Sequence, residues 1–186
     1  MIKRQLKSFS VVFSAHKSVK GYTLIELLVV LSILTMLSSI LVVYSRTGER
    51  QLILYKDQAK IINSIIRAKS LAVQSFSAGE NVCGYGAYFD QSGKIIIFKD
   101  LSNDCLSSDS VYSGPDEDVQ TDQLDGRLSF SSLDFNSVLF IPPDPIILFD
   151  GQNSPGVKNI IISGGGDSVV KVAVNSAGQI TAVSGK

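Results

Sequence analysis

The chain begins with a polar, basic segment and then changes abruptly to an apolar run. Residues 22–44 read YTLIELLVVLSILTMLSSILVVY, and Glu26 is the only charged residue among them. At about 1.5 Å of rise per residue, a helix of this length crosses the hydrocarbon core of a bilayer. The pattern therefore predicts a leader over residues 1–21 and a membrane-spanning helix over residues 22–45.

After this run, apolar residues recur at helical spacing over residues 46–78. One stripe comprises Leu52, Tyr55, Ala59, Ile62, Ile66, Lys69, Val73 and Phe76, and a second comprises Leu54, Ile61, Ile65, Ala68 and Ala72. Residues three and four apart share one side of an amphipathic helix. Because no proline intervenes, we expect one helix from about Leu24 to Ser75, about 75 Å long, with Gly79 ending it.

Beyond Gly79, short β-like runs alternate with turn residues. We expect strands in VCGYGAYFD, KIIIFKD, RLSFSSL, VLFIP, IILFD, KNIIIS, VVKVAVN and QITAVS. The acidic segment from Ser107 to Asp125 has few apolar residues, so we expect a surface loop there. The predicted class is α+β, with one long N-terminal helix packed on an antiparallel β-domain over residues 79–186.

Charge is distributed unevenly along the chain. The formal net charge is zero, but five basic residues and no acidic residue precede Gly21. Without them the net charge is about −5, which disfavours binding of polyanions through bulk electrostatics. The single histidine, His16, also lies in this leading segment. The rest of the chain therefore lacks the imidazole that Ser-His-Asp and Cys-His catalysis and the usual zinc sites require.

Two cysteines, Cys83 and Cys105, follow the apolar run. In an oxidising compartment they would close a loop of about twenty residues, a bond worth roughly 3 kcal/mol of unfolding free energy. The sequence DQSGKIII between them is typical of a strand turn that folds the chain back. We favour this disulfide over the alternative of two small buried residues that do not meet.

The stretch KGYTLIELLVVLSIL places a small residue before the apolar run. A secretory signal peptide is cut after its apolar region, whereas a cut at Lys20-Gly21 retains the helix and frees an amino group on Tyr22. This motif resembles the N-terminus of type IV pilins and type II secretion pseudopilins. The resemblance covers Lys20 to about Tyr44 and lies in the basic leader, the glycine, the aromatic first mature residue and the glutamate at the fifth mature position.

The resemblance implies that a prepilin peptidase cleaves between Gly21 and Tyr22 and methylates the new amino group of Tyr22. It also implies that Glu26 pairs with the amino terminus of a neighbouring subunit during filament assembly. An acid within a bilayer costs about 2.5 to 3.5 kcal/mol and needs such a partner. The alternative is a capping box, in which Thr23 and Glu26 satisfy free amides at the helix start. Both roles are compatible.

Two further features bear on the subfamily. The chain has no proline about twenty residues into the mature helix, where many major pilins have one, and this favours a minor pilin or pseudopilin. The segments IIRAKSLAVQS, NVCGYGAYFD and VVKVAVNSAGQITAVS also resemble minor pseudopilins related to GspH and FimT.

Other candidate chemistry is weaker. SGGGDS and CGYGAY lack the residues that complete nucleotide-binding loops, and we interpret them as a hairpin turn and a strand bulge. A calcium site at Asp116, Asp118, Asp122 and Asp125, in a segment that also contains Glu117, would use the oxygen ligands that calcium prefers, but solvated surface charge is the commoner explanation. We predict no cofactor, no resident metal and no enzyme activity.

The predicted function is that of a filament subunit, in a type IV pilus, a type II secretion system or a DNA-uptake filament. Its predicted partners are prepilin peptidase, other pilin or pseudopilin subunits, an inner-membrane assembly platform and, before assembly, the lipid bilayer. The leader should be cytoplasmic and the β-domain extracytoplasmic. One alternative is a filament-tip module that binds DNA through Arg67, Lys69, Lys158 and Lys171, or binds a surface ligand. Another is a signal-anchored protein that keeps its leader.

Overall fold

The computed structural model describes residues 21–75, 81–143, 146–165 and 168–185. The expected stop at Gly79, the leader before Gly21 and the stripe residue Phe76 lie outside these ranges. The chain divides into two compact units, Met1–Val43 and Tyr44–Lys186. Each unit is described by itself.

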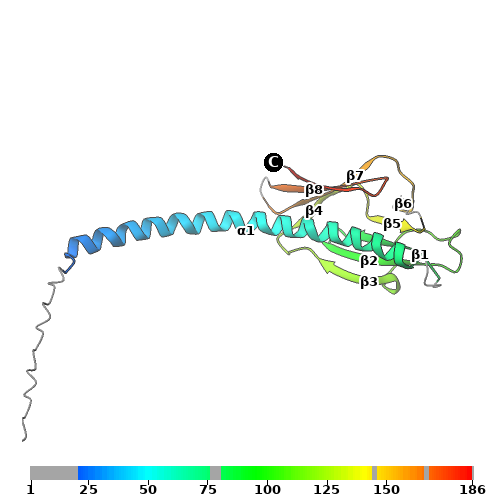
Figure 1. Ribbon diagram of the computed structural model, residues 1–186, viewed down its shortest axis with the longest axis horizontal. Helices are drawn as coiled ribbons and strands as arrows, with labels where there is room; N and C mark the ends of the chain where they lie inside the picture. Colours follow the sequence, from blue (N-terminus) through cyan, green and yellow to red (C-terminus); the bar gives the residue numbers. More distant parts are fainter. Residues whose placement is uncertain (1–20, 76–80, 144–145, 166–167, 186) are drawn as a thin grey trace, which may run out of the picture. The chain divides into compact units, whose positions relative to one another are not determined.

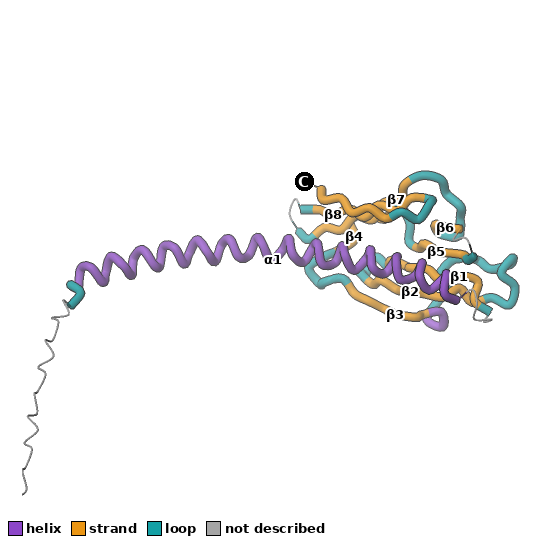
Figure 2. Tube along the Cα trace, in the orientation of Figure 1, coloured by secondary structure: helices purple, strands orange, loops and turns teal. Residues whose placement is uncertain are grey.

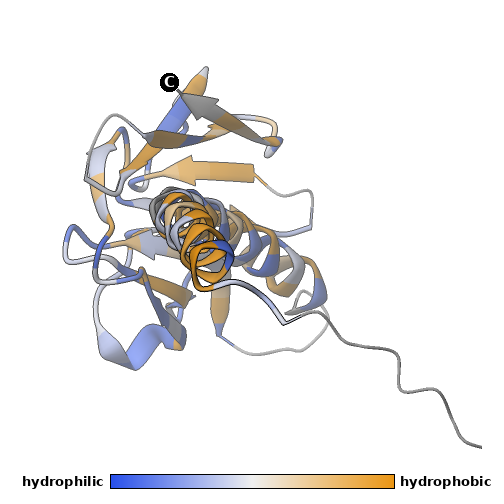
Figure 3. Ribbon diagram, turned by 90° about the vertical axis from the view of Figure 1, so that its left-hand side faces the viewer, coloured by the Kyte–Doolittle hydropathy of each residue, from blue (hydrophilic) through white to orange (hydrophobic). Residues whose placement is uncertain are grey.

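The predicted long helix is α1 (Leu24–Ser75), 52 residues of the α-helical class. Its described portion in the first unit is apolar on all sides, and most of its ribbon is coloured hydrophobic in Figure 3. None of the segment Leu24–Val42 is buried within the protein. Helix propensity and backbone hydrogen bonding maintain this segment, but its side chains have no protein core to pack against.

In the second unit, α1 buries one face only. The buried side chains are Leu54, Asp57, Gln58, Ile61, Ser64, Ile65, Ala68 and Ala72. These positions recur at three- and four-residue intervals and therefore lie on one side of the helix. The second of the two apolar stripes is thus the core stripe, while Leu52, Tyr55, Ile66 and Val73 of the first stripe are at least half exposed.

The described residues of the second unit form nine strands in two antiparallel sheets (Figures 1 and 2). The first sheet has the order β3-β2-β1-β5-β6 and comprises β1 (Val82–Phe89), β2 (Lys94–Leu101), β3 (Asp118–Gln123), β5 (Ser137–Ile141) and β6 (Ile146–Phe149). The second has the order β4-β7-β8-β9 and comprises β4 (Ser129–Leu133), β7 (Val157–Ser163), β8 (Val169–Asn175) and β9 (Ile180–Gly185). The eight predicted strands are all present, and the α+β class is confirmed.

The main core joins α1 to the inner faces of both sheets. Ile61 and Ile65 of α1 belong to one apolar cluster with Phe89 and Ile97 of the first sheet and Val172 of the second. Alternation along each strand puts these side chains on the helix-facing side. Fully burying each such side chain contributes about 1.5 to 3 kcal/mol to the free energy of unfolding.

A smaller apolar cluster lies on the opposite face of the first sheet. It contains Ile96, Phe98 and Leu139, with Tyr88 and Tyr112 packed against it. The Tyr112 ring stacks on Tyr88 at 4.7 Å between centroids and meets Phe98 edge-on at 5.6 Å. The segment after β2 therefore folds back over this face.

The glycines of CGYGAY are explained by close packing as well as by a bulge. The register of β1 against β2 shifts between Val82 and Gly84, which is the predicted irregularity. A Cβ atom on Gly86 would lie 2.5 Å from the Phe98 ring and 2.6 Å from the Val138 carbonyl oxygen. Only glycine leaves room for the Phe98 ring across β1.

The prediction of a surface loop from Ser107 to Asp125 is wrong in part. This segment contains the 3₁₀ helix η1 (Pro115–Glu117) and strand β3, which pairs with β2 through residues such as Asp122 opposite Ile95. Glu117 and Leu124 are buried. Because β3 lies at a sheet edge and most of its side chains are exposed, it tolerates the polar composition that suggested a loop.

Candidate functional site

The start of α1 carries the predicted processing residues. Gly21 and Tyr22 precede the helix, and the Tyr22 side chain is 79 % exposed. Thr23 occupies the N-cap position, where its Oγ1 accepts a hydrogen bond of 3.3 Å from the Glu26 amide. The Thr23 carbonyl oxygen accepts the next bond, from the Leu27 amide at 3.2 Å. An accessible peptide bond therefore stands directly before a capped helix.

Glu26 lies in the first turn of α1, and its side chain is exposed. Its backbone amide takes part in the cap, which is one half of the predicted capping box. Among the described residues, no ion-pair partner of the Glu26 carboxylate is present. The helix dipole favours an acid in this position, and the carboxylate can accept a charged donor from outside the chain.

The helix segment Leu24–Val42 is long enough and apolar enough to cross a membrane. Within it, the hydroxyl groups of Ser32, Thr35 and Ser39 donate to carbonyl oxygens three residues earlier, at 2.7 to 2.9 Å. Satisfied hydroxyl groups lower the free-energy cost of placing polar residues in a hydrocarbon environment. Glu26 is the one charged residue of this segment, and its carboxylate has no such bond within the described residues.

The two cysteines are joined in the second unit. Cys83 of β1 and Cys105 form a disulfide with a Cα–Cα distance of 5.2 Å. Cys105 lies in the segment between β2 and η1, so the bond ties that segment to β1. Leu106, next to the disulfide, is 98 % exposed.

The four aspartates considered for calcium do not converge. Asp116 is exposed in η1, and Asp118 accepts a bond of 2.7 Å from the Tyr112 hydroxyl. Asp122 accepts from the Gln120 side chain at 2.7 Å, and Asp125 pairs with Arg127 at 3.0 Å. Within the described ranges, no group of three acidic, histidine or cysteine residues is arranged to hold a metal ion.

These contacts shift the pKa values of residues that take part in them. Burial and the hydrogen bond to Asp118 raise the pKa of Tyr112 to about 12. The hydrogen bonds from Arg127 lower the pKa of Asp125, and the same pairing raises the pKa of Arg127. Both effects stabilise the charged forms of an exposed pair, which contributes little to the free energy of unfolding.

The predicted basic patch is not assembled. Arg67 and Lys69 are two positions apart on α1 and therefore point about 200° apart. Arg67 lines a groove beside β3, whereas the Lys69 ammonium lies 3.5 Å from the Gly178 carbonyl oxygen, next to β9. Lys158 and Lys171 belong to β7 and β8 of the other sheet. Arg67 is thus separated from the cations that were expected to join it.

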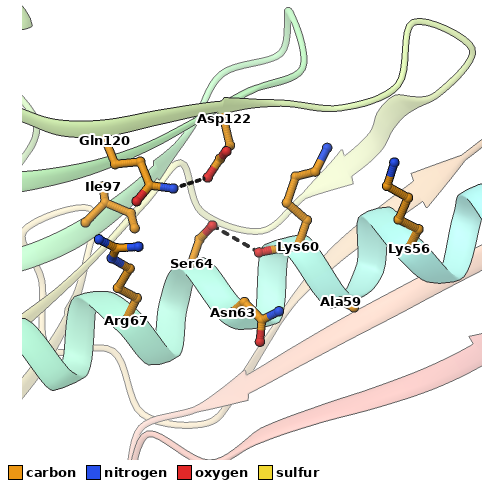
Figure 4. A pocket seen from close by; sticks show the side chains of 9 residues that line it. All are labelled: Lys56, Ala59, Lys60, Asn63, Ser64, Arg67, Ile97, Gln120 and Asp122. Atoms are coloured by element: carbon orange, nitrogen blue, oxygen red, sulfur yellow. Dashed lines mark hydrogen bonds between the residues drawn. The ribbon is translucent and has the colours of Figure 1, made fainter.

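Sequence reasoning missed the groove in which Arg67 lies. It has a volume of about 410 Å³ and is lined by α1 and by the helix-facing side of β2 and β3 (Figure 4). Its lining includes the cations Lys56, Lys60 and Arg67 and the polar side chains Gln120 and Asp122. The available sequence signal was the spacing of the three cations along one side of the helix.

Comparison with protein families gives one match. Residues 16–42 match the model described as the prokaryotic N-terminal methylation motif. The comparison with curated proteins gives no match, and the comparison with solved structures gives none. The motif implies processing by prepilin peptidase and assembly with other pilin subunits. The chain thus carries the prokaryotic N-terminal methylation motif on an α+β, pilin-like arrangement, which is consistent with the type IV pilin and pseudopilin family.

Proposed function

We propose that the protein is a minor pilin or pseudopilin of a type IV pilus, type II secretion or DNA-uptake filament. Prepilin peptidase cleaves between Gly21 and Tyr22 and methylates the Tyr22 amino group. The basic leader stays on the cytoplasmic side, as the positive-inside rule requires, and the β-domain is displayed outside. The subunit passes from the bilayer, through an inner-membrane assembly platform, into the filament.

The observation that carries this proposal is the unpartnered state of the apolar segment of α1. No residue of Leu24–Val42 is buried in the protein. Such a surface is stable only in lipid or against other apolar helices. A subunit that is first membrane-anchored and then packed among the helices of its neighbours meets both conditions in turn.

Glu26 determines how the helices of neighbouring subunits align along their length. A lone carboxylate in an apolar environment is unfavourable, and a neighbour's Tyr22 amino group relieves the cost when the two helices are correctly aligned. The contact is a charge-assisted hydrogen bond in a low-dielectric setting, where it is strong. Misaligned helices leave the acid unpaired and are disfavoured.

The assembly role of Glu26 is tested with Glu26→Gln and Thr23→Ala. Glutamine retains a side chain that can cap the helix start but removes the charge. We expect Glu26→Gln to be inserted and cleaved normally, and its incorporation into purified filaments to fall about tenfold or more, as loss of a buried charge pair implies. Thr23→Ala removes a cap worth about 1 kcal/mol and should leave incorporation nearly unchanged.

Processing is tested separately by N-terminal sequencing after coexpression with the peptidase. Wild-type protein should begin at Tyr22, and replacement of Gly21 by a bulky residue should leave the leader attached. A mature end beyond Ser38 or at Met1 would refute the processing step. Normal incorporation of Glu26→Gln together with defective Thr23→Ala would show instead that Glu26 acts only in capping.

A further inference from the structure

The groove between α1 and β3 contains three cations, two of which have no direct ion pair in the described part of the chain. Lys60 is neutralised, since its ammonium lies 3.0 Å from the buried Asp57 carboxylate and also donates to the Gln123 carbonyl oxygen. Lys56 and Arg67 are exposed, and neither has an ion pair within 4.0 Å among the described residues. Lys56 is near enough to Asp125 to help lower the pKa of that carboxyl group. The groove thus offers two cations without a direct ion pair, on either side of a fixed one.

The cations form a row along the groove. Figure 4 shows the side chains of Lys56, Lys60 and Arg67 directed toward the side of β3, from which Gln120 and Asp122 face them. Lys56 and Arg67 are eleven positions apart on α1, a rise of about 16 Å. That distance corresponds to about five residues of extended chain at 3.3 Å each. The row therefore fits an extended peptide better than a compact anion.

One wall of the groove belongs to an edge strand of the first sheet. Within the described parts of the chain, β3 is the last strand of its sheet and pairs with β2 alone. Its other side presents backbone N–H and C=O groups with no strand partner among the described residues. A strand added there would extend the sheet, and every second side chain would face the helix, where the cations lie.

We propose that this groove binds an extended, acidic peptide segment of a partner protein as an additional strand beside β3. The backbone of β3 supplies main-chain hydrogen bonds, and Lys56 and Arg67 meet carboxylates at alternate positions of the peptide. Asp57 and Asp122 keep the groove from attracting polyanions indiscriminately, and the acidic balance of the chain beyond the leader repels nucleic acid at longer range. This site does not depend on the filament role proposed above.

The test uses the full chain in detergent micelles and a fluorescent peptide in which glutamate alternates with threonine over about nine positions. Fluorescence anisotropy should show binding of this peptide and little binding of the matched glutamine peptide. Arg67→Gln and Lys56→Gln should each weaken binding about two- to fivefold, the range for exposed ion pairs. Lys158→Gln, which removes a cation from the other sheet, is the control and should leave binding unchanged.

A second readout examines the added strand. Amide hydrogen exchange of β3 should slow on binding, while exchange of β9, an edge of the other sheet, should not change. Peptides N-methylated at alternate backbone positions keep their carboxylates, and one of the two registers should lose binding because its donors to β3 are gone. Equal binding of both N-methylated peptides, with β3 unprotected, would overturn strand addition.

Competition binding experiments identify the class of molecule that occupies the groove. Stronger binding of an oligonucleotide duplex, weakened by the same two substitutions, would overturn the proposal in favour of nucleic acid. Stronger binding of a peptide with the sequence of residues 115–123 would replace the partner with a second copy of this chain. Failure of every acidic peptide to bind would refute the site, whatever the outcome of the processing and assembly experiments.

Discussion

The two halves of α1 use apolar residues in different ways. In Leu24–Val42 no residue is buried within the protein, although most of the residues are apolar. In the second half, Ile61, Ile65, Ala68 and Ala72 are completely buried, while the opposite side of the helix is exposed. One half therefore depends on surroundings outside the chain, and the other depends on the two sheets.

The spacing of apolar residues along the sequence already shows this difference between the two halves of α1. The first half fills successive positions with apolar residues, so no single face is distinguished, as in a helix surrounded by lipid or by other helices. The second half restricts its buried residues to one side, as in a helix that packs on a sheet. Continuous helical structure thus joins a segment built for assembly to a segment built for folding.

The largest effect is expected when one large apolar residue in each half of α1 is replaced by alanine. Ile65→Ala removes fully buried atoms and should lower the free energy of unfolding of the β-domain unit by about 2 to 5 kcal/mol. Leu34→Ala, at a 52 % exposed position, should change it by less than about 0.5 kcal/mol. Urea unfolding of the full-length variants in micelles measures both values. Equal losses would show that the two halves do not differ in this way.

The fold was largely predictable because its signals are local. Helical spacing predicted α1, and β-branched runs between turn residues predicted eight of the strands. β3 was missed because an edge strand with the sequence DVQTDQ has a single apolar residue and therefore no apolar face. Its partner β2 stabilises it, and pairing between strands cannot be inferred from composition alone.

The choice of buried stripe on α1 was also beyond sequence reasoning. Both stripes are apolar, and the buried side includes the polar residues Asp57 and Gln58. The structure satisfies them, since Asp57 accepts a bond of 2.6 Å from the Asp125 amide and Gln58 donates to the Lys171 carbonyl oxygen at 3.0 Å. These partners are far away in the sequence, so hydropathy gave no reason to place the two residues inside.

The two candidate sites also differ in how far the sequence alone could predict them. The motif around Gly21, Tyr22 and Glu26 was identified because it is contiguous and its order carries the chemistry. The groove beside β3 was missed because it requires Lys56 and Arg67 to face a strand more than fifty residues later. Isolated surface cations are usually only solvated charge, and tertiary structure is needed to distinguish a row from scattered residues.

Two glycine-to-alanine substitutions, one in the β-domain and one in α1, should change the free energy of unfolding by intermediate amounts and in opposite directions. Gly86→Ala would place a Cβ atom 2.5 Å from the Phe98 ring, and we expect a loss of about 1 to 3 kcal/mol in unfolding free energy. Gly48→Ala, in α1 with no atom within 4 Å of the new Cβ, should instead stabilise the helix by about 0.5 to 1 kcal/mol. Opposite signs in thermal unfolding are the expected result. Destabilisation by Gly48→Ala would mean that α1 needs flexibility where its second half begins.

The smallest expected effect concerns a buried acid of the β-domain, in contrast to Glu26 in the apolar half. Asp100 is 2 % exposed and accepts a hydrogen bond of 2.5 Å from the Ser108 hydroxyl. Burial raises its pKa, the Ser108 bond opposes this, and nearby Asp109 adds to the rise. The folded state therefore binds a proton more readily than the unfolded state, whose pKa is about 3.9.

This contribution of Asp100 to stability is fully present below the unfolded-state pKa, and it is lost as the pH rises through the raised pKa of the folded state. The raised pKa means that ionising this buried carboxyl group is less favourable in the folded state than in the unfolded state. Asp100→Asn can still accept the Ser108 hydrogen bond but carries no charge, so it should be slightly more stable than wild type at pH 7 and show a flatter dependence of unfolding free energy on pH. Urea unfolding at pH 4 and pH 7 gives the comparison. A variant that is less stable than wild type at pH 7 would show that the charged carboxylate is the stabilising form, and that the charge-assisted bond with Ser108 outweighs the burial of Asp100.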